Sequence, residues 1–233
     1  MPTINENIRV VRERIAEAAE RSGRTAGDIT LIGVTKTVGP EPMREMIACG
    51  VTDIGENRAQ EIVSKYPLFP QNGLNWHMIG HLQRNKVKYI VDKVCLIHSV
   101  DNMPLAAEID RLYGKLTKRA DILIEINIAG EDTKNGVAPG DCAELLKNLA
   151  ELSFVRLRGL MTIAPYTEKP EETRDFFKKM CDLYVDICKN CVNNVSIGDF
   201  TVLSMGMTND YAVAIEEGSN MVRIGTGIFG ARS

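Results

Sequence analysis

The feature that most constrains the fold of this chain is an alternation of short, β-branched apolar runs with amphipathic stretches from about residue 30 onward. Eight runs have the length and composition of strands, at residues 30–35, 51–55, 74–80, 94–99, 121–129, 155–162, 200–205 and 220–225. The stretches between them have helical periodicity, at residues 41–49, 58–65, 82–91, 103–117, 140–152, 170–189 and 210–217. Strands that alternate with helices form parallel sheets, because each crossover between parallel strands needs a long connection.

Eight such units in 233 residues fit the lower end of the size range of (β/α)8 barrels. The main rival is a doubly wound open sheet, which usually has fewer strands. Its dinucleotide fingerprint G-x-G-x-x-G is absent after the first predicted strand, where the chain reads VTKTVG. We therefore predict an α/β protein with one domain over residues 1–233. It comprises an N-terminal segment, residues 1–28, with a helix over 4–21, and a TIM barrel over 29–233.

Composition excludes several classes of protein. Hydrophobic residues make up 44% of the chain and charged residues 25%, which excludes a largely disordered chain. The net charge of -3 gives no general attraction for nucleic acid. The polar N-terminus is unlike a signal peptide, so we expect a cytoplasmic protein with no membrane partner. The six cysteines are expected to be reduced, and Cys188 and Cys191 lack a second ligand pair for zinc.

Polar side chains occur where the predicted strands end, which is where the active sites of (β/α)8 barrels lie. Lys36 directly follows the first predicted strand, and strand alternation gives it the same facing as Ile32 and Val34. We therefore expect its amine at the barrel mouth. Partial removal from water lowers the pKa of a lysine below about 10.4 and leaves more neutral amine to attack a carbonyl. The alternative is a lysine that has simply reached solvent.

The last two predicted strands lead into small, hydroxyl-bearing and glycine-rich segments. The seventh strand runs into Ser204, Met205, Gly206, Met207 and Thr208, and the eighth runs into Gly225, Thr226 and Gly227. In this fold the corresponding loops commonly bind phosphate, because backbone N–H groups and a helix N-terminus converge there. The segments therefore predict a phosphate site. The alternative is that their glycines serve only as turn residues.

Arg223 lies inside the apolar run of the eighth predicted strand, where an unpaired guanidinium would be costly. One interpretation is a salt bridge inside the barrel, for example with Glu125. The other is a hydrogen bond to a ring nitrogen of a bound cofactor. A permanently charged arginine would keep a pyridine nitrogen unprotonated and so weaken the ring as an electron sink.

The three histidines all lie near predicted strand ends. His77 and His98 occur in or beside apolar segments, which favours hydrogen-bonded core positions for both. His81 opens a predicted helix and is a candidate for shaping the barrel mouth. Motifs of serine hydrolases, zinc proteases, kinases and Walker-type nucleotide-binding proteins are absent from the sequence.

Six segments together resemble the pyridoxal phosphate homeostasis protein family. They are VTK at 34–36, IGENRAQE at 54–61, WHMIGHLQRNK at 76–86, GLM at 159–161, LSMGMTND at 203–210 and VRIGT at 222–226. They follow one another in order over most of the chain, and the third and fifth are highly specific. The resemblance implies a single barrel of the alanine racemase N-terminal type that binds pyridoxal 5'-phosphate.

The same resemblance implies roles for individual residues. Lys36 would carry the cofactor as a covalent aldimine, Asn57 would lie near its ring, and Arg223 would face the pyridine nitrogen. The phosphate would be held by Ser204, Met205, Gly206, Gly225 and Thr226. Secondary candidates are His81, Met161 and Lys134, the last in a loop that matches an SKSG-like segment of the family. The alternative for Lys134 is an exposed loop lysine.

The resemblance leads to a hypothesis of cofactor homeostasis and delivery with little or no catalysis, in which apo-enzymes that use the cofactor are the acceptors. Related racemases add a β-rich domain that supplies a tyrosine base, and we expect no such domain after Ser233. One lysine on one face of a substrate cannot serve efficiently as both acid and base. The alternatives are a pyridoxal phosphate-dependent amino-acid racemase or related lyase, and a cofactor-free class I aldolase. We expect a monomer.

Overall fold

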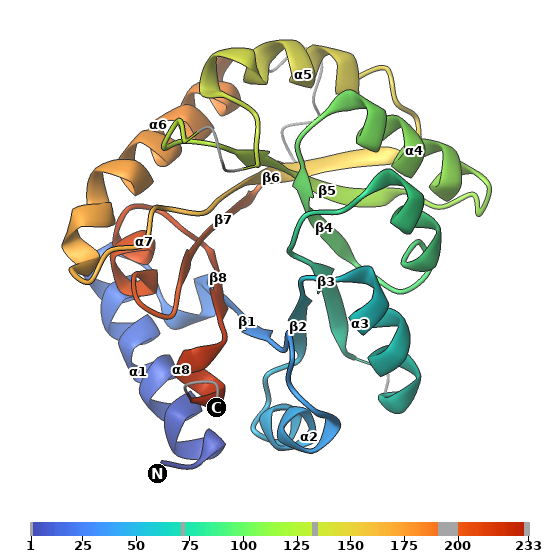
Figure 1. Cartoon of the computed structure of the whole chain (residues 1–233). Helices are drawn as coiled ribbons and strands as arrows, with labels where there is room; N and C mark the ends of the chain where they lie inside the picture. Colours follow the sequence, from blue (N-terminus) through green and yellow to red (C-terminus); the bar gives the residue numbers. More distant parts are fainter. Residues whose placement is uncertain (1, 71–72, 132–134, 191–199, 231–233) are drawn as a thin grey trace.

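The computed structural model describes residues 2–70, 73–131, 135–190 and 200–230. Within these residues, parallel strands form a closed barrel in which each strand pairs with the next and β8 pairs with β1 (Figure 1). The strands are β1 (Thr30–Val34), β2 (Asp53–Glu56), β3 (Asn75–Met78), β4 (Leu96–Val100), β5 (Ala120–Ile126), β6 (Val155–Thr162), β7 (Val202–Met207) and β8 (Met221–Ile224). The predicted (β/α)8 barrel is confirmed.

Helices surround the barrel on its outside (Figure 1). They are α1 (Ile4–Arg21), α2 (Pro40–Ala48), α3 (Ala59–Lys65), α4 (Met103–Gly114), α5 (Cys142–Leu149), α6 (Arg174–Asn190), α7 (Tyr211–Glu216) and α8 (Thr226–Phe229). Short 3₁₀ helices are η1 (Ala26–Asp28), η2 (Tyr66–Leu68), η3 (Arg84–Tyr89), η4 (Pro139–Asp141) and η5 (Pro170–Thr173). Because helices surround the barrel and side chains fill its interior, the strands are largely buried on both faces, and the buried side chains include polar ones such as His77, His98 and Arg223.

Two apolar layers hold the barrel together. The larger lies between strands and helices and includes Ile54, Ile122 and Val222. The smaller joins side chains of five different strands, and side chains from opposite sides of a barrel can meet only in its interior. Its members are Ile32, Leu96, Leu123, Met161 and Met221.

The segment predicted as a helix at 82–91 is instead the 3₁₀ helix η3. Its only buried residue is Val87. An α-helix in a protein is stabilised mainly by an apolar stripe packed on its neighbours, and one buried residue does not supply such a stripe. The predicted helix over 4–21 is confirmed as α1, whose first turn is closed by a capping box between Thr3 and Glu6.

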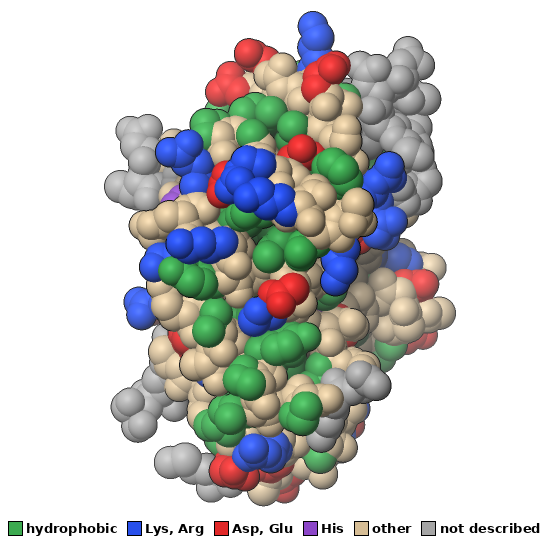
Figure 2. Space-filling model, turned by 90° about the vertical axis from the view of Figure 1, so that its right-hand side faces the viewer, with side chains coloured by type: hydrophobic (Ala, Val, Ile, Leu, Met, Phe, Trp, Pro, Cys, Tyr) green, Lys and Arg blue, Asp and Glu red, His purple; other side chains and the backbone are tan. Residues whose placement is uncertain are grey.

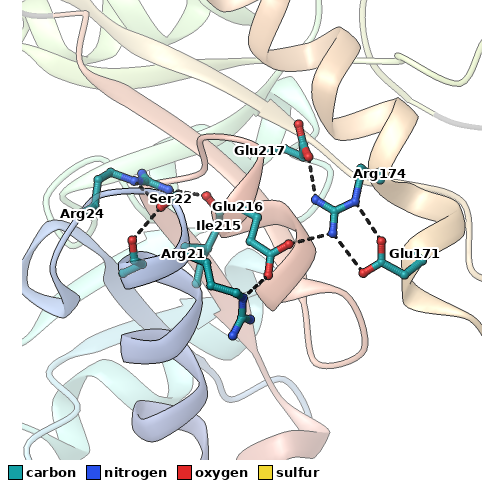
Figure 3. A network of polar contacts seen from close by, with 9 residues as sticks. Arg21, Ser22, Arg24, Glu171, Arg174, Ile215, Glu216 and Glu217 are labelled. Carbon is teal, nitrogen blue, oxygen red and sulfur yellow. Dashed lines mark hydrogen bonds and ion pairs between the residues drawn. The ribbon is translucent and has the colours of Figure 1, made fainter.

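An ion-pair network connects the end of α1 to segments that are far from it in the sequence. Arg21 Nε contacts Glu216 Oε1 at 2.7 Å, and Arg174 Nη2 contacts the other oxygen of the same carboxylate at 2.7 Å. Arg174 also pairs with Glu171 and Glu217, at 2.8 Å and 2.6 Å (Figure 3). The network therefore joins α1, α7 and the start of α6.

Figure 2 shows the face that turns away to the right in Figure 1, with Lys and Arg side chains interspersed among hydrophobic ones. Lys86 and Lys88 lie over the ring of Tyr89, with their ammonium nitrogens 5.7 Å and 5.0 Å from its centroid. These lysine stems therefore cover part of an exposed aromatic surface. In the described part of the chain, no helix is both long and apolar enough to cross a membrane.

Cys188 lies on α6, but Cys191, the other half of the C-x2-C pair, lies outside the described residues. Across residues 2–70, 73–131, 135–190 and 200–230, no group of three or more His, Cys, Asp or Glu side chains is arranged to hold a metal ion.

Candidate functional site

A cavity of about 420 Å³ opens at the C-terminal ends of the strands. It brings together five of the residues selected from the sequence. These are Lys36, Asn57, Arg223, Gly225 and Thr226. Met207 and Thr208, from the segment expected to bind phosphate after the seventh strand, also line it. The sequence reasoning missed the rest of its lining, which is formed by Val34, Ile79, Ile163, Tyr166 and Asn209.

A second cavity of about 460 Å³ lies beside the first and shares part of its wall. The shared residues are Val34, Lys36, Gly225 and Thr226. Its remaining lining comes from α1, from α2 and the loop before it, and from the α8 region, with its apolar part formed by Ile4, Val38, Pro42 and Phe229. Half-buried Lys36 thus borders two cavities.

The backbone that presents Lys36 is tightly held. Thr37 has a φ of 63°, a left-handed conformation that a β-branched residue seldom adopts. Its N–H donates to Glu61 Oε2 at 2.8 Å. On the other side of Lys36, the carbonyl of Thr35 accepts a 2.8 Å hydrogen bond from Lys65 Nζ. A conformation of this kind persists only where the surroundings fix it, and α3 supplies both contacts.

Lys65 links this backbone to two carboxylates. Its Nζ lies 2.7 Å from Glu56 Oε1 and 2.8 Å from Glu61 Oε2. Burial raises the pKa of Glu56, although hydrogen bonds from Lys65 and Thr35 act in the opposite direction. Glu56 is fully buried and its Oε2 has no hydrogen-bond partner in the described part of the protein. The i,i+4 spacing of Glu61 and Lys65 was the available sequence indication of this cluster.

The opposite wall of the cavity is the turn after β7. Asp210 Oδ1 accepts from the Met207 N–H at 2.6 Å, and Thr208 Oγ1 accepts from the Gly227 N–H at 3.1 Å. The backbone N–H groups of Thr208, Asn209 and Thr226 have no hydrogen-bond acceptor among the described residues. All three belong to residues that line the cavity. They are therefore available as donors to an anion.

Arg223 lies at the inner end of the cavity and is only 3% exposed. Its Nη1 donates to Ser204 Oγ at 2.7 Å, and its Nη2 donates to the Thr162 carbonyl at 2.9 Å. Burial lowers the pKa of Arg223 to about 10, against the opposing charges of Glu125 and Asp210. The guanidinium is therefore still charged at neutral pH. Its hydrogen bonds go to a hydroxyl and a carbonyl, so Glu125 acts on it only through space.

Ser204, Met205 and Gly206 do not line the cavity, because β7 continues to Met207 instead of ending at residue 205. The hydroxyl of Ser204 lies inside the barrel, and Met205 is part of the outer apolar layer. Gly206 has a φ of 94°, and an added Cβ would lie 2.6 Å from the Cβ of Ala214. The cavity wall is taken instead by the next three residues.

The other sequence candidates are spread over different environments. His77 and His98 are buried and hydrogen-bonded to each other, which confirms the core positions expected for them. The side chain of His81 is 46% exposed at the rim, with Nδ1 3.8 Å from Asp101 Oδ2. Met161 is part of the apolar layer inside the barrel. Lys134 lies outside the described residues.

The donor set fits an anionic carbonyl compound with an aromatic ring. Lys36 contributes a primary amine, the backbone N–H groups of two turns contribute anion donors, and Arg223 contributes a group that can only donate. Ile79 and Ile163 supply apolar surface for a ring. The cavity of about 420 Å³ falls in the range of small-molecule sites.

Comparison with known proteins agrees with this picture. Residues 3–233 match the family described as "Alanine racemase, N-terminal domain". A pyridoxal phosphate homeostasis protein of Aquifex aeolicus is 47% identical over 227 residues, which cover 97% of both chains. The crystal structure of a protein from Bifidobacterium adolescentis matches with a TM-score of 0.90 and 32% identity, over 97% of this chain and 94% of the other. PipY of Synechococcus elongatus PCC7942 with PLP bound matches with a TM-score of 0.80 and 32% identity, over 94% of this chain and 100% of PipY.

Proposed function

The chain belongs to the family of pyridoxal phosphate homeostasis proteins, within the alanine racemase N-terminal domain family, and from this membership we propose that it binds pyridoxal 5'-phosphate and takes part in the cytoplasmic homeostasis and delivery of this cofactor. The observation that carries the proposal is the position of Lys36 in a cavity that also holds Arg223 and unpartnered backbone N–H groups.

The cofactor supplies an aldehyde, which condenses with a primary amine, and a phosphate ester, which needs hydrogen-bond donors. Lys36 provides the amine. The phosphate is assigned to the backbone N–H groups of Thr208, Asn209 and Thr226, in place of the Ser204, Met205 and Gly206 set. Gly225 belongs to the same turn as Thr226, and Asn57 lines the cavity beside the apolar surface for the ring.

Arg223 sets the electronic character of the site. A guanidinium has no lone pair to accept a hydrogen bond, so it can only donate to a ring nitrogen that faces it. A ring nitrogen held in this way stays unprotonated, which weakens stabilisation of negative charge on a bound amino acid. Arg223 therefore favours a carrier over a catalyst. The proteins that accept the cofactor from this carrier are apo-enzymes that use it, and we infer that the carrier acts as a monomer.

One observation favours a second function, weak amino-acid racemisation. Racemisation needs acid and base groups on the two faces of a carbon centre, and Lys36 can serve only one. Tyr166 also lines the cavity and would supply a second group, although its side chain is 86% exposed and so is not held in place by packing. Exchange of the α-proton of amino acids with deuterated water tests this function. Rapid exchange that is lost in Tyr166→Phe would establish it over the carrier.

The proposed function is tested by covalent attachment of the cofactor. The purified protein, mixed with pyridoxal phosphate, should show a visible absorption band, and borohydride should bleach it and leave the cofactor fixed to the peptide that contains Lys36. Lys36→Ala should lose both the band and the attached mass, while exposed Lys88→Ala keeps them. Attachment to Lys36→Ala at the wild-type stoichiometry would mean that the site is elsewhere, and no binding by the wild-type protein would reject the function.

A further inference from the structure

A line of hydrogen bonds crosses the interior of the barrel and ends at Arg223. Asp53 Oδ1 lies 3.0 Å from His77 Nε2, and His77 Nδ1 lies 3.0 Å from His98 Nε2. His98 Nδ1 lies 3.2 Å from Ser204 Oγ, which accepts from Arg223 Nη1 at 2.7 Å. The line therefore connects the first residue of β2, at the far end of the barrel, to a residue that lines the cavity.

The two ends determine the direction of every bond in this line. Arg223 can only donate, so Ser204 Oγ accepts from it and has its own proton left for His98 Nδ1. At the other end, burial acts to raise the pKa of Asp53, but its contacts with His77, Asn75 and Thr52 outweigh burial and keep the pKa below its usual value. Asp53 is therefore a carboxylate that can only accept, which requires a proton on His77 Nε2.

Both histidines are then neutral and carry their proton on Nε2. His98 is fully buried, and burial, together with the charge of Arg223, lowers its pKa well below the usual value. With a lone pair on His77 Nδ1 and a proton on His98 Nε2, the three groups between the ends, Ser204, His98 and His77, each donate once and accept once along the line. The reverse arrangement would leave the buried Ser204 hydroxyl proton without an acceptor, and an unsatisfied buried donor is destabilising.

We propose that Asp53, His77, His98 and Ser204 are positioning residues for Arg223, in a one-directional hydrogen-bond chain that ties the guanidinium to a carboxylate at the opposite end of the barrel. The proposal deepens the function proposed above and rests on it, because Arg223 matters only when a ring faces it. Arg223 itself lines the cavity, so the chain holds in place a guanidinium that borders the site. The chain also polarises the guanidinium through successive bonds to a distant charge.

The direction of the chain can be tested without cofactor. The protein has only three histidines, so ¹⁵N-histidine labelling gives a simple spectrum in which exposed His81 serves as the internal reference. We expect His77 and His98 to be neutral, with the proton on Nε2, at neutral pH. A doubly protonated His77, or a proton on His98 Nδ1, would overturn the proposal. This experiment gives its answer even if the protein fails to bind pyridoxal phosphate.

The link from the chain to the cavity is tested by a matched pair of serine variants. Ser204→Ala removes a hydroxyl that bridges Arg223 and His98, whereas Ser99→Ala removes an equally buried hydroxyl that has no hydrogen-bond partner in the described part of the protein. A hydrogen bond contributes about 1 kcal/mol, so Ser204→Ala should weaken the affinity for pyridoxal phosphate about five-fold and shift the visible band. Ser99→Ala should do neither.

Two further variants separate positioning from packing or from direct contact with the phosphate. Ser204→Thr keeps the hydroxyl and should restore the wild-type band and affinity. Asp53→Asn changes only the far end of the chain and should shift the visible band in the same direction as Ser204→Ala. A wild-type spectrum and affinity in Ser204→Ala, or an unchanged spectrum in Asp53→Asn, would reject the positioning role. An effect of Ser204→Ala equal to that of Ser99→Ala would reject it as well.

Discussion

Glu125 is a carboxyl group inside the barrel whose charge is unfavourable there. Burial, reinforced by Asp101, raises its pKa to about 7, while Arg223 acts in the opposite direction. In the unfolded chain the same group titrates near 4.5. Between these values the folded protein holds a proton that the unfolded chain has lost. The free energy of unfolding should therefore fall by roughly 3 kcal/mol as pH rises through this window, and level off above it.

Glu125→Gln should remove this part of the pH dependence. The measurement is urea unfolding at several pH values from 4.5 to 8, with exposed Glu151→Gln as the control for an ordinary glutamate. The difference between wild-type protein and Glu125→Gln should change across the window, whereas the difference for Glu151→Gln should stay constant. Parallel curves for Glu125→Gln would show that the carboxyl group ionises in the folded protein as it does in the unfolded chain.

At the scale of single residues, the sequence identifies groups whose chemistry is unusual for their surroundings. Lys36 and Arg223 were predictable because a charged group beside or inside an apolar strand is costly to bury unless it has a partner or a ligand. Both residues line the cavity. Ser204 was predicted to contact the phosphate and does not line the cavity, because β7 continues to Met207, and strand ends are the least certain feature of a pattern. The extension of β7 to Met207 moves the turn that faces the cavity by two residues.

At the scale of elements, the backbones of β6 and β7 approach each other closely at Gly159. Gly159 pairs with Val202 and has a φ of 153°, and an added Cβ would lie 1.7 Å from the Val202 carbonyl oxygen. Gly159→Ala should therefore push the two strands apart and lower the free energy of unfolding by more than about 2 kcal/mol. Gly140→Ala, where an added Cβ meets nothing within 4 Å, is the control in urea unfolding. Equal stability of the two variants would contradict the close approach.

The contact between α3 and the end of β1 depends on one cation. Lys65→Met would leave buried Glu56 without its partner, and breaking a buried ion pair in this way costs about 3–5 kcal/mol. Removing both charges in Lys65→Met with Glu56→Gln should cost less than Lys65→Met alone, because no fully buried carboxylate is left without its cation, and Glu61 keeps the N–H of Thr37 as a donor. Urea unfolding of Lys65→Met, of Glu56→Gln and of the double variant gives the coupling energy between the two groups. Strictly additive losses would mean that the two groups do not interact.

Elements with a continuous apolar pattern were predictable, and those fixed by their neighbours were not. Residues 155–162 form β6 with the predicted bounds, because the Gly-Leu-Met-Thr segment is soon followed by Pro165, which has no N–H to donate to a neighbouring strand. Residues 84–89 form a 3₁₀ helix because the surrounding surface buries only Val87. The register shift within the pairing of β7 and β8 likewise depends on both strands together and has no counterpart in either sequence alone.

At the scale of the whole molecule, α1 is built into the outer surface of the barrel where the chain closes on itself. It contacts α7, α8 and α2, and Figure 1 shows it running beside α8. The side chain of Asn7 donates to the Ile228 carbonyl at 2.9 Å. Arg24, just after α1, donates to the carbonyls of Ile215, Gly218 and Ser219 at the end of α7. These contacts predict that residues before β1 unfold together with the barrel.

Arg24→Met tests this cooperativity, because it leaves those helix-end carbonyls without their charged donor and should cost about 2 kcal/mol. The single tryptophan, Trp76, reports on a different part of the barrel, packed between Tyr66 and Phe69 at ring distances of 5.8 Å and 6.3 Å. If the chain unfolds as one unit, tryptophan fluorescence and far-UV circular dichroism should shift by the same amount in Arg24→Met. Arg9→Met, on the exposed face of α1, should move neither by more than about 0.5 kcal/mol. A shift in circular dichroism with an unchanged fluorescence transition would mean that the N-terminal segment unfolds separately from the barrel.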